Sequence, residues 1–281
     1  MSFKTILALV WVLLISAGAW TQASADEMTL MAFNVGKADS MLLCSGENAY
    51  LIDTGRGSTW DGTEEQLLAL GIRELDGVII THMDSDHVGG LKKMLKSDIQ
   101  TKHIYVPPYY LDEDGKGGKS PAEKAADKRD RQVEPLKAGN ILPLGNGKLT
   151  VIGPIRAASD KEDNNSLVLL AEAAGGKILL AGDMEFPEEA DLLKAGVIPE
   201  ADVLKVGNHG DDDATSDALL NAVRPGYAVI STSTAEKTST PAKRVLEALA
   251  AWKTKVYQTQ EAKAGILVTI QEGNITIKRV D

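Results

Sequence analysis

The chain reads Thr81-His82-Met83-Asp84-Ser85-Asp86-His87-Val88-Gly89-Gly90 directly after the apolar run Val78-Ile79-Ile80. The apolar run predicts a buried strand, and the two histidines and two aspartates that follow it lie within six residues. Imidazole and carboxylate groups together are typical ligands of Zn, Mn or Fe. The alternative is a solvated loop, but such loops rarely gather four of these groups beside a glycine pair. The stretch therefore predicts a metal site at the end of a buried strand.

Two neighbouring ions fit this loop better than one, because its potential ligands alternate along the chain. Paired ions lie about 3.5–4 Å apart and need a bridging carboxylate and at least one more histidine. Two further apolar runs are followed by such groups: residues 177–181 by Asp183, and residues 203–206 by His209. Open α/β sheets bind ligands beyond the carboxyl ends of their strands, so the three strand ends predict one shared metal centre.

Further motifs accompany this loop in a characteristic order: Phe33-Asn34-Val35-Gly36-Lys37-Ala38-Asp39-Ser40, Leu51-Ile52-Asp53-Thr54-Gly55, Asn164-Asn165-Ser166-Leu167-Val168, Ala181-Gly182-Asp183 and Leu204-Lys205-Val206-Gly207-Asn208-His209-Gly210. With them the chain resembles the metallo-β-lactamase-fold hydrolases. Within that superfamily it is most similar to the soluble C-terminal domain of the competence protein ComEC. The predicted fold class is α/β, an αββα sandwich of two mixed β-sheets with helices on the outer faces.

The resemblance implies a centre of two divalent metal ions, Zn or Mn. It implies six protein ligands: His82 and Asp84 for the first ion, Asp86, His87 and His209 for the second, and Asp183 as the bridge between the ions. It also implies that Asp53 orients the ligands from behind them. Asp86 and Asn208 are the candidate catalytic residues.

Three positions depart from the ComEC-like pattern. Asn208 stands where relatives usually have histidine, Ser239-Thr240-Pro241 replaces a Gly-His-Pro motif, and Asp211-Asp212-Asp213 follows where serine is common. The missing histidine is a candidate contact to substrate or leaving group, so its loss concerns catalysis more than metal binding. The three aspartates would repel a phosphate unless they face away from the metals.

Residues 1–25 have the pattern of a secretory signal peptide: Lys4, an apolar stretch over residues 6–20, and the small-residue site Ala23-Ser24-Ala25. An uncleaved anchor is the alternative. We expect a mature protein of residues 26–281 that is secreted, periplasmic or otherwise extracytoplasmic, without stable membrane insertion once the signal is cleaved. No other segment of this sequence is apolar enough to cross a bilayer, so DNA transport is not expected to follow from the resemblance.

Charge and cysteine content limit the partners and the redox chemistry. The formal net charge is −10, which predicts no general binding to nucleic acids. Cys44 is the only cysteine, so an intramolecular disulfide is impossible, and its apolar neighbours predict a buried thiol. No linker separates the predicted ligands, so we expect residues 26–281 to form a single metallo-β-lactamase-like domain.

Four local patterns carry further structural predictions. Thr63–Gln66 fits a capping box at the start of a helix, and Thr240-Pro241 predicts another helix start with proline in the first turn. Asp112–Glu134 predicts a mobile loop followed by a solvated helix, either a lid over the site or a plain surface excursion. His103 is predicted to be a partly buried strand residue and not a ligand.

The predicted function is an extracytoplasmic metal-dependent hydrolase that acts through a metal-bound hydroxide on phosphodiester or phosphoester bonds. The resemblance suggests nucleic-acid or cell-wall phosphodiesters, whereas the negative charge favours a small phosphoester. The rival is a catalytically weakened metal-binding or accessory protein related to DNA uptake. A third alternative, a membrane-tethered accessory of an uptake system, requires the N-terminal segment to stay uncleaved.

Overall fold

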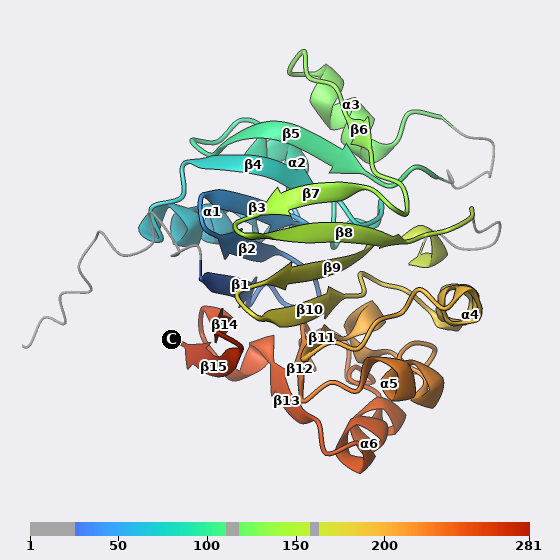
Figure 1. The fold of residues 1–281 in the computed structure, drawn as a ribbon. Coiled ribbons are helices and arrows are strands. Elements are labelled where there is room, and N and C mark those ends of the chain that lie inside the picture. The colour runs from blue at the N-terminus through green and yellow to red at the C-terminus, as the bar shows by residue number, and fades with distance from the viewer. Residues whose placement is uncertain (1–25, 111–117, 158–162) are drawn as a thin grey trace, which may run out of the picture.

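The computed structural model describes residues 26–110, 118–157 and 163–281 (Figure 1). The predicted α/β sandwich is confirmed, because these residues form two mixed β-sheets. The larger sheet contains, in spatial order, β15 (Asn274–Val280), β14 (Gly265–Gln271), β1 (Glu27–Phe33), β2 (Met41–Ser45), β3 (Asn48–Ile52), β4 (Glu74–Ile79), β5 (Gln100–Val106) and β6 (Glu134–Pro135). The smaller sheet contains β13 (Lys255–Gln258), β12 (Tyr227–Ile230), β11 (Val203–Lys205), β10 (Gly176–Leu180), β9 (Val168–Ala173), β8 (Gly147–Gly153) and β7 (Ile141–Leu144).

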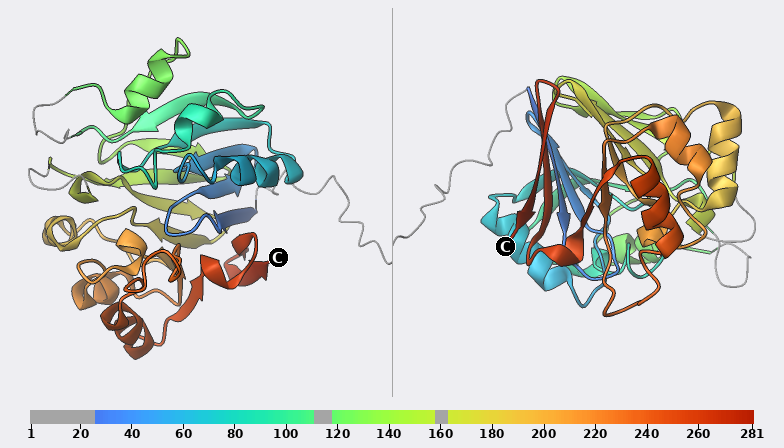
Figure 2. Two further views of the ribbon diagram at one scale, coloured as in Figure 1. Left: turned by 180° about the vertical axis from the view of Figure 1, so that it is seen from behind. Right: turned by 90° about the horizontal axis from the view of Figure 1, so that it is seen from below.

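Helices cover the outer face of each sheet, and the two sheets face each other (Figure 2). The larger sheet carries α1 (Trp60–Ala69), α2 (Leu91–Met94) and α3 (Pro121–Asp127), and the smaller sheet carries α4 (Phe186–Ala195), α5 (Asp217–Val223) and α6 (Lys243–Ala251). The central strands of each sheet, such as β2 and β9, are therefore buried on both faces, which explains why they are nearly continuous apolar runs. The edge strand β15 instead contains only exposed and half-buried residues.

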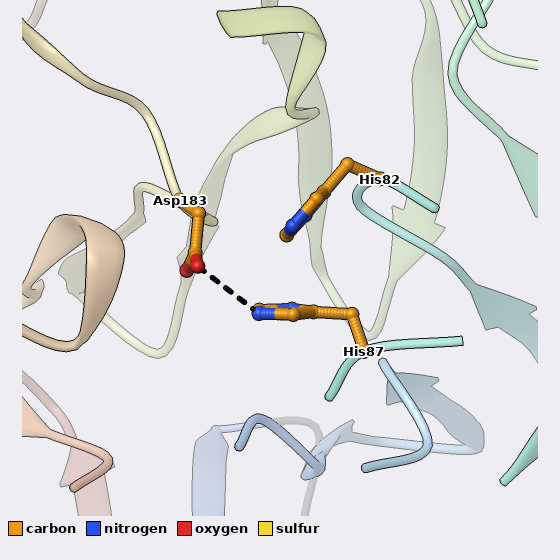
Figure 3. A group of neighbouring side chains, drawn as sticks. All are labelled: His82, His87 and Asp183. Atoms are coloured by element: carbon orange, nitrogen blue, oxygen red, sulfur yellow. Dashed lines mark ion pairs between the residues drawn. The ribbon is translucent and has the colours of Figure 1, made fainter. Parts of the chain in front are cut away.

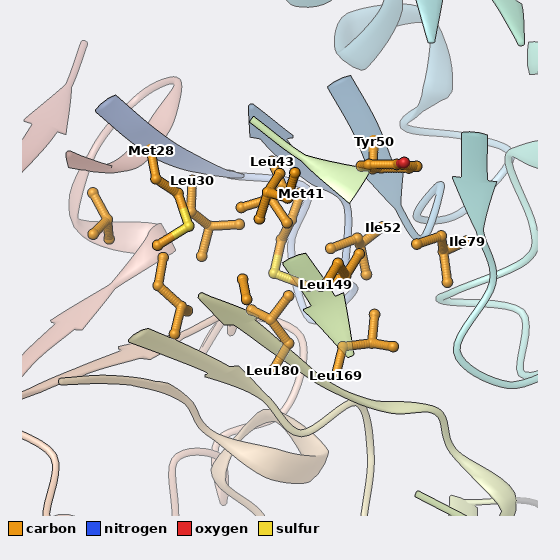
Figure 4. Packing of buried hydrophobic residues seen from close by; sticks show 14 of the residues in the cluster. Met28, Leu30, Met41, Leu43, Tyr50, Ile52, Ile79, Leu149, Leu169 and Leu180 are labelled. Atoms are coloured by element: carbon orange, nitrogen blue, oxygen red, sulfur yellow. The ribbon is translucent and has the colours of Figure 1, made fainter. Parts of the chain in front are cut away.

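Alternating side chains of one strand enter two different cores. In β1, Met28 and Leu30 point into the central core between the sheets, where they pack with residues such as Leu169 and Leu180 of the smaller sheet (Figure 4). Phe33 of the same strand lies instead in the core beneath the helices of the larger sheet. The predicted burial of Cys44 in this outer core is confirmed.

Parallel pairing brings the ends of the chemistry-bearing strands together. β3 pairs with β4 in parallel in the larger sheet, and β10 pairs with β11 in parallel in the smaller one. The loops that follow these four strands therefore leave the two sheets at the same edge, where the predicted ligands lie. No helix within the described ranges combines the length and the apolar character that a bilayer crossing requires.

Two predicted helix starts and one predicted surface helix are wrong in detail. Helix α1 begins at Trp60, so Thr63 lies inside it, and the Thr63 hydroxyl donates to the Thr59 carbonyl instead of capping an end. Helix α6 begins at Lys243, two residues after Pro241. Helix α3 is not solvated all round, because its alanines pack into the outer core. The loop predicted before it falls at residues 111–117, outside the described residues.

Candidate metal centre

The loop between β4 and α2 is closed tightly against the loop after β3. The backbone N–H of Thr54 donates to the His87 carbonyl at 2.8 Å. A Cβ atom on Gly90 would lie 2.3 Å from the Thr54 carbonyl oxygen, so only glycine permits this approach. The glycine pair of the sequence motif therefore has a structural role, which is to let the loop that carries the histidines pack against the loop that carries Asp53.

His87 lies at the middle of the centre. Its Nε2 is 3.2 Å from Asp183 Oδ2 and 3.3 Å from His209 Nε2, and its Nδ1 is 2.8 Å from Asp53 Oδ2. The His82 ring lies beside it, with ring centroids 4.0 Å apart. Figure 3 shows both rings directed toward Asp183, which approaches from the other sheet. Residues predicted from separate motifs thus meet at one point.

The second ring nitrogen of each histidine has a partner, which orients the ring. Asp53 contacts Nδ1 of His87 and also accepts hydrogen bonds from the Thr81 backbone and hydroxyl. The Nδ1 of His209 is 2.9 Å from the Ser231 carbonyl, which only accepts, so this nitrogen carries the hydrogen. Orientation of this kind leaves Nε2 as the metal-ligating atom. The structure places Asp53 where the orienting role requires it.

Asp183 and Asp86 both lie close to Nε2 of His209. The Nε2 of His209 is 3.2 Å from Asp183 Oδ2 and 3.7 Å from Asp86 Oδ2. Asp86, His87 and His209, the three residues predicted for the second ion, each offer one ligand atom within 4.8 Å of the others. Asp183 reaches histidines of both sheets, as a bridging position demands.

Two buried atoms of the centre have no hydrogen-bond partner among the described residues: His82 Nε2 and Asp183 Oδ1. Leaving a buried polar atom unsatisfied costs about 1–3 kcal/mol, so such atoms need a reason. A cation bound between these side chains would satisfy both atoms. The donor set of imidazole and carboxylate therefore fits divalent metal ions.

Asp84 is exposed at the rim of the centre, where it meets a residue that the sequence did not indicate. Asp163, in the short 3₁₀ helix η1 (Asp163–Asn165), has its Oδ1 3.7 Å from His82 Nε2. His82, Asp84 and Asp163 together offer three ligand atoms within 4.8 Å of one another. Asp163 directly precedes the Asn164-Asn165-Ser166 motif but belongs to no recognisable ligand pattern itself.

The charges at the centre shift the pKa values of its residues strongly. Burial alone would lower the pKa of His87, but Asp183 and Asp53 outweigh it and hold the pKa well above its usual value. Burial, and then the neighbouring His87, lower the pKa of His82 to about 4, so this ring is neutral near pH 7. Burial, followed by Asp183 and Asp84, raises the pKa of Asp163 to about 8. Metal binding would therefore release protons.

A buried ion pair behind the histidines was missed by sequence reasoning. Lys205 Nζ lies 2.7 Å from Asp39 Oδ2, and both side chains are fully buried. Burial would raise the pKa of Asp39, but Lys205 lowers it below the usual value. A lysine between Leu204 and Val206 in a buried strand was the available signal, because such a charge needs a partner inside the protein.

Two basic side chains lie next to Asp86. Lys37 Nζ and Arg56 Nη2 each lie 3.4 Å from Asp86 Oδ2, and Arg56 Nη2 donates to the Lys37 carbonyl at 2.8 Å. The Lys37 side chain is 16% exposed and the Arg56 side chain 33% exposed, so both are accessible from solvent. Arg56 also pairs with Glu236, its Nη1 lying 3.8 Å from Glu236 Oε2, so the basic side chains here are matched by acidic partners.

Asn208, Asp211 and Asp212, which depart from the family pattern, each contact a polar or charged side chain. The Asn208 amide donates to Glu185 Oε1 at 3.3 Å and is nearly buried. The Asp211 carboxylate pairs with Lys237, and Arg244 contacts Asp212 at 3.2 Å, so two of the three aspartates have cationic partners.

Two other residues named from the sequence lie outside the groups of potential metal ligands found among the described residues. Thr240 is buried, and its carbonyl accepts a hydrogen bond from Thr232. His103 belongs to none of these groups. Its Nδ1 lies 2.7 Å from Glu134 Oε1, on the larger sheet.

Comparisons with known proteins agree with this arrangement. Residues 34–234 match the family described as the metallo-β-lactamase superfamily. The chain is 29% identical over 246 residues to ComE operon protein 3 of Bacillus subtilis (strain 168), covering 81% of this chain and 31% of that protein. It is 28% identical over 238 residues to competence protein ComA of Neisseria gonorrhoeae, covering 83% of this chain and 31% of that protein. The chain thus spans less than a third of the length of these relatives.

A solved structure confirms the fold. The metallo-β-lactamase fold protein YhfI from Bacillus subtilis superposes with a TM-score of 0.53 at 14% identity, covering 87% of this chain and 99% of YhfI. At this identity the likeness concerns the fold alone.

Proposed function

Because the chain belongs to the metallo-β-lactamase superfamily, we propose that it is an extracytoplasmic metal-dependent hydrolase of phosphoester or phosphodiester bonds. One observation carries the proposal. His82, His87, Asp183 and His209 converge from both sheets, and His82 Nε2 and Asp183 Oδ1 are buried without a hydrogen-bond partner among the described residues. Two divalent ions bound there, Zn or Mn, would lower the pKa of a water molecule and polarise the substrate.

The protein's own groups hold and orient this centre. Asp53 and the Ser231 carbonyl fix the rings of His87 and His209 through Nδ1, which leaves Nε2 free to bind metal. Of the candidate catalytic residues, Asp86 lies 3.7 Å from His209 Nε2 and 3.4 Å from Lys37 Nζ through its Oδ2. Asn208 would donate a hydrogen bond to a charged oxygen, but an amide does not transfer protons near pH 7.

The basic side chains beside Asp86 support an anionic substrate. Lys37 and Arg56 contact Asp86 and are reachable from solvent, so a phosphate oxygen that approaches the centre would meet two cationic groups. The net charge of −10 weighs against a long polyanion. A small phosphoester fits both facts best, and the competence relatives keep nucleic-acid and cell-wall phosphodiesters among the substrates to test.

The second candidate is a catalytically weakened metal-binding or accessory protein related to DNA uptake. Asn208 favours it, because the side chain at that position is an amide already bonded to Glu185 and offers no titratable group. The names of the similar competence proteins favour the same alternative.

A metal analysis combined with a hydrolysis screen distinguishes the two candidates. We expect the purified protein to contain two ions per chain and to hydrolyse a phosphodiester or phosphomonoester, but not a carboxyl ester or a β-lactam. Arg56→Gln should raise KM for phosphoesters while the metal content stays at two. Two bound ions without turnover on any substrate would favour the accessory role.

The proposed location has a separate test. Mass spectrometry of the protein isolated from its native cells should give an N-terminus near Asp26. An exported protein that retains Met1 would contradict the cleaved signal peptide.

A further inference from the structure

The potential metal ligands among the described residues form several overlapping groups, and two of these groups that share no residue differ in chemistry. His82, Asp84 and Asp163 form one group, with a single imidazole and two carboxylates. The other group is Asp86, His87 and His209, with two imidazoles and one carboxylate. Asp183 contacts His87 and His209 and also belongs to a group with His82, so it adds a carboxylate to either side.

The histidine of the first group indicates that a cation belongs there. His82 is fully buried, and its Nδ1 is 3.2 Å from the Thr81 hydroxyl, which leaves Nε2 directed toward Asp163. That Nε2 has no hydrogen-bond partner among the described residues. The distance of 3.7 Å from Nε2 to Asp163 Oδ1 is too long for a hydrogen bond, but the two atoms are close enough to share one ion.

The chain segment before β9 brings Asp163 to this position. The backbone N–H of Ser166 donates to the Asp163 carbonyl at 3.0 Å, and the Leu167 N–H donates to the Thr81 carbonyl at 2.8 Å. The second bond joins this segment directly to the residue that precedes His82. Backbone hydrogen bonds therefore hold Asp163 next to the loop that carries His82.

We propose that Asp163 is a protein ligand of the first ion, which gives the two metal positions different selectivity. The inference rests on the dinuclear centre of the proposed function. The first position combines one imidazole with as many as three carboxylates, an oxygen-rich set that suits Mn²⁺. The second position has two imidazoles and suits Zn²⁺. Zn²⁺ binds more tightly than Mn²⁺ at most sites of this kind, so the difference appears as a smaller preference for Zn²⁺ at the first position.

Metal binding itself tests the proposal, without any assay of activity. The wild-type chain and Asp163→Asn are dialysed against Mn²⁺ or Zn²⁺, and bound metal is counted by elemental mass spectrometry. We expect two ions in the wild type, and in Asp163→Asn a loss of affinity at one position of at least about 10–100-fold, the loss that changing an orienting residue already produces. Asp191→Asn is the matched control, because Asp191 lies on α4, pairs with Arg156 and belongs to none of the groups of potential metal ligands.

A second variant tests the selectivity and guards against a folding defect. Asp163→His replaces the oxygen ligand by a nitrogen ligand, so it should keep two ions and bind Zn²⁺ over Mn²⁺ more strongly at the first position. His209→Ala should weaken the other position instead. Two ions bound by Asp163→Asn with affinities within threefold of the wild type, or an unchanged metal preference in Asp163→His, would overturn the proposal.

These outcomes are independent of turnover. A wild-type protein that hydrolyses phosphoesters while Asp163→Asn binds metal normally refutes the role of Asp163 alone. A wild-type protein that hydrolyses nothing, but whose first ion is lost in Asp163→Asn, supports the metal assignment and refutes the hydrolase.

Discussion

Asp183 is the side chain on which the histidines of both sheets converge. Its Oδ2 lies 3.2 Å from His87 Nε2 and 3.2 Å from His209 Nε2, and these two histidines follow β4 and β11. Burial would raise the pKa of Asp183, but His209 and His87 hold it well below the usual range. The carboxylate is thus ionised and placed to contact two cations at once.

Asp183→Asn should therefore cost more bound metal than Asp53→Asn. The first change weakens both positions, whereas Asp53 contacts Nδ1 of one ring, and loss of an orienting residue typically costs about 10–100-fold in affinity. Equilibrium dialysis of both variants measures the difference. Two ions bound normally by Asp183→Asn would show that the carboxylate does not bridge.

Asn208→His should raise phosphodiesterase turnover and leave the metal content unchanged. The amide donates to Glu185 Oε1 at 3.3 Å, so a histidine there would have an acceptor for one ring N–H and would add a group that titrates near pH 7. General acid assistance is typically worth about 10²–10⁴-fold in rate. The variant is assayed beside His209→Ala, which should lose an ion. An unchanged rate would show that the missing histidine does not limit the chemistry.

The residues that sequence reasoning found are those that carry a local signal. The loop of residues 82–90 gathers its histidines and aspartates within a few positions, and Asp183 and His209 follow apolar runs. Asp163 has no such signal, because its relation to His82 exists only after β9 is paired into the other sheet. Arg56 and Lys37 were missed for the same reason, since isolated basic residues in loops usually face solvent.

At the scale of elements, strands were easier to predict than the ends of helices. Strands buried on both faces appear as apolar runs regardless of their neighbours. Helix α1 begins at Trp60, where no side chain caps its backbone, so the capping pattern at Thr63 was misleading. The burial of Ala122 in α3 could not be predicted either. A short alanine-rich helix has no distinct apolar face in its sequence, and this helix is buried because it packs against α2.

Helix α4 carries a buried carboxyl group whose state should make stability depend on pH. Neither oxygen of Glu188 has a hydrogen-bond partner among the described residues. Burial, and then Asp191 and Glu189, raise its pKa well above the ordinary 4.5. Above pH 4.5 the unfolded chain therefore ionises this group while the folded chain keeps its proton. The folded state binds more protons, so stability falls as pH rises from 4.5 toward the folded pKa.

Glu188→Gln should remove the loss of folding stability that the wild type shows as pH rises. The variant should gain stability relative to the wild type between pH 5 and pH 8, by at most about 1.4 kcal/mol for each pH unit within the window. Urea unfolding of both proteins at the two pH values measures it. Glu247→Gln on the exposed side of α6 is the control, and its difference from the wild type should not change with pH. A pH-independent difference for Glu188→Gln would contradict the raised pKa.

At the scale of the whole molecule, the metal centre joins the same edge of both sheets. His82 and His87 come from the larger sheet, and Asp183 and His209 come from the smaller one. The apolar core between the sheets holds their faces together, whereas at this edge the contacts are between titratable groups, such as His87 with Asp183 and Lys205 with Asp39. Bound cations held by ligands from both sheets would add a further attraction across this interface.

Removal of metal should therefore lower the melting temperature of the whole chain. An ion that binds only the folded state at 100 times its Kd stabilises it by about 2.7 kcal/mol, and each kcal/mol shifts the Tm of a protein of this size by about 2–4 °C. We expect calorimetry to give a Tm about 5–10 °C lower after treatment with a chelator, and recovery when Zn²⁺ or Mn²⁺ is returned. Asp183→Asn, which should hold metal weakly, should respond much less to the chelator. Equal melting temperatures with two ions bound and with none would show that the ions do not link the two sheets.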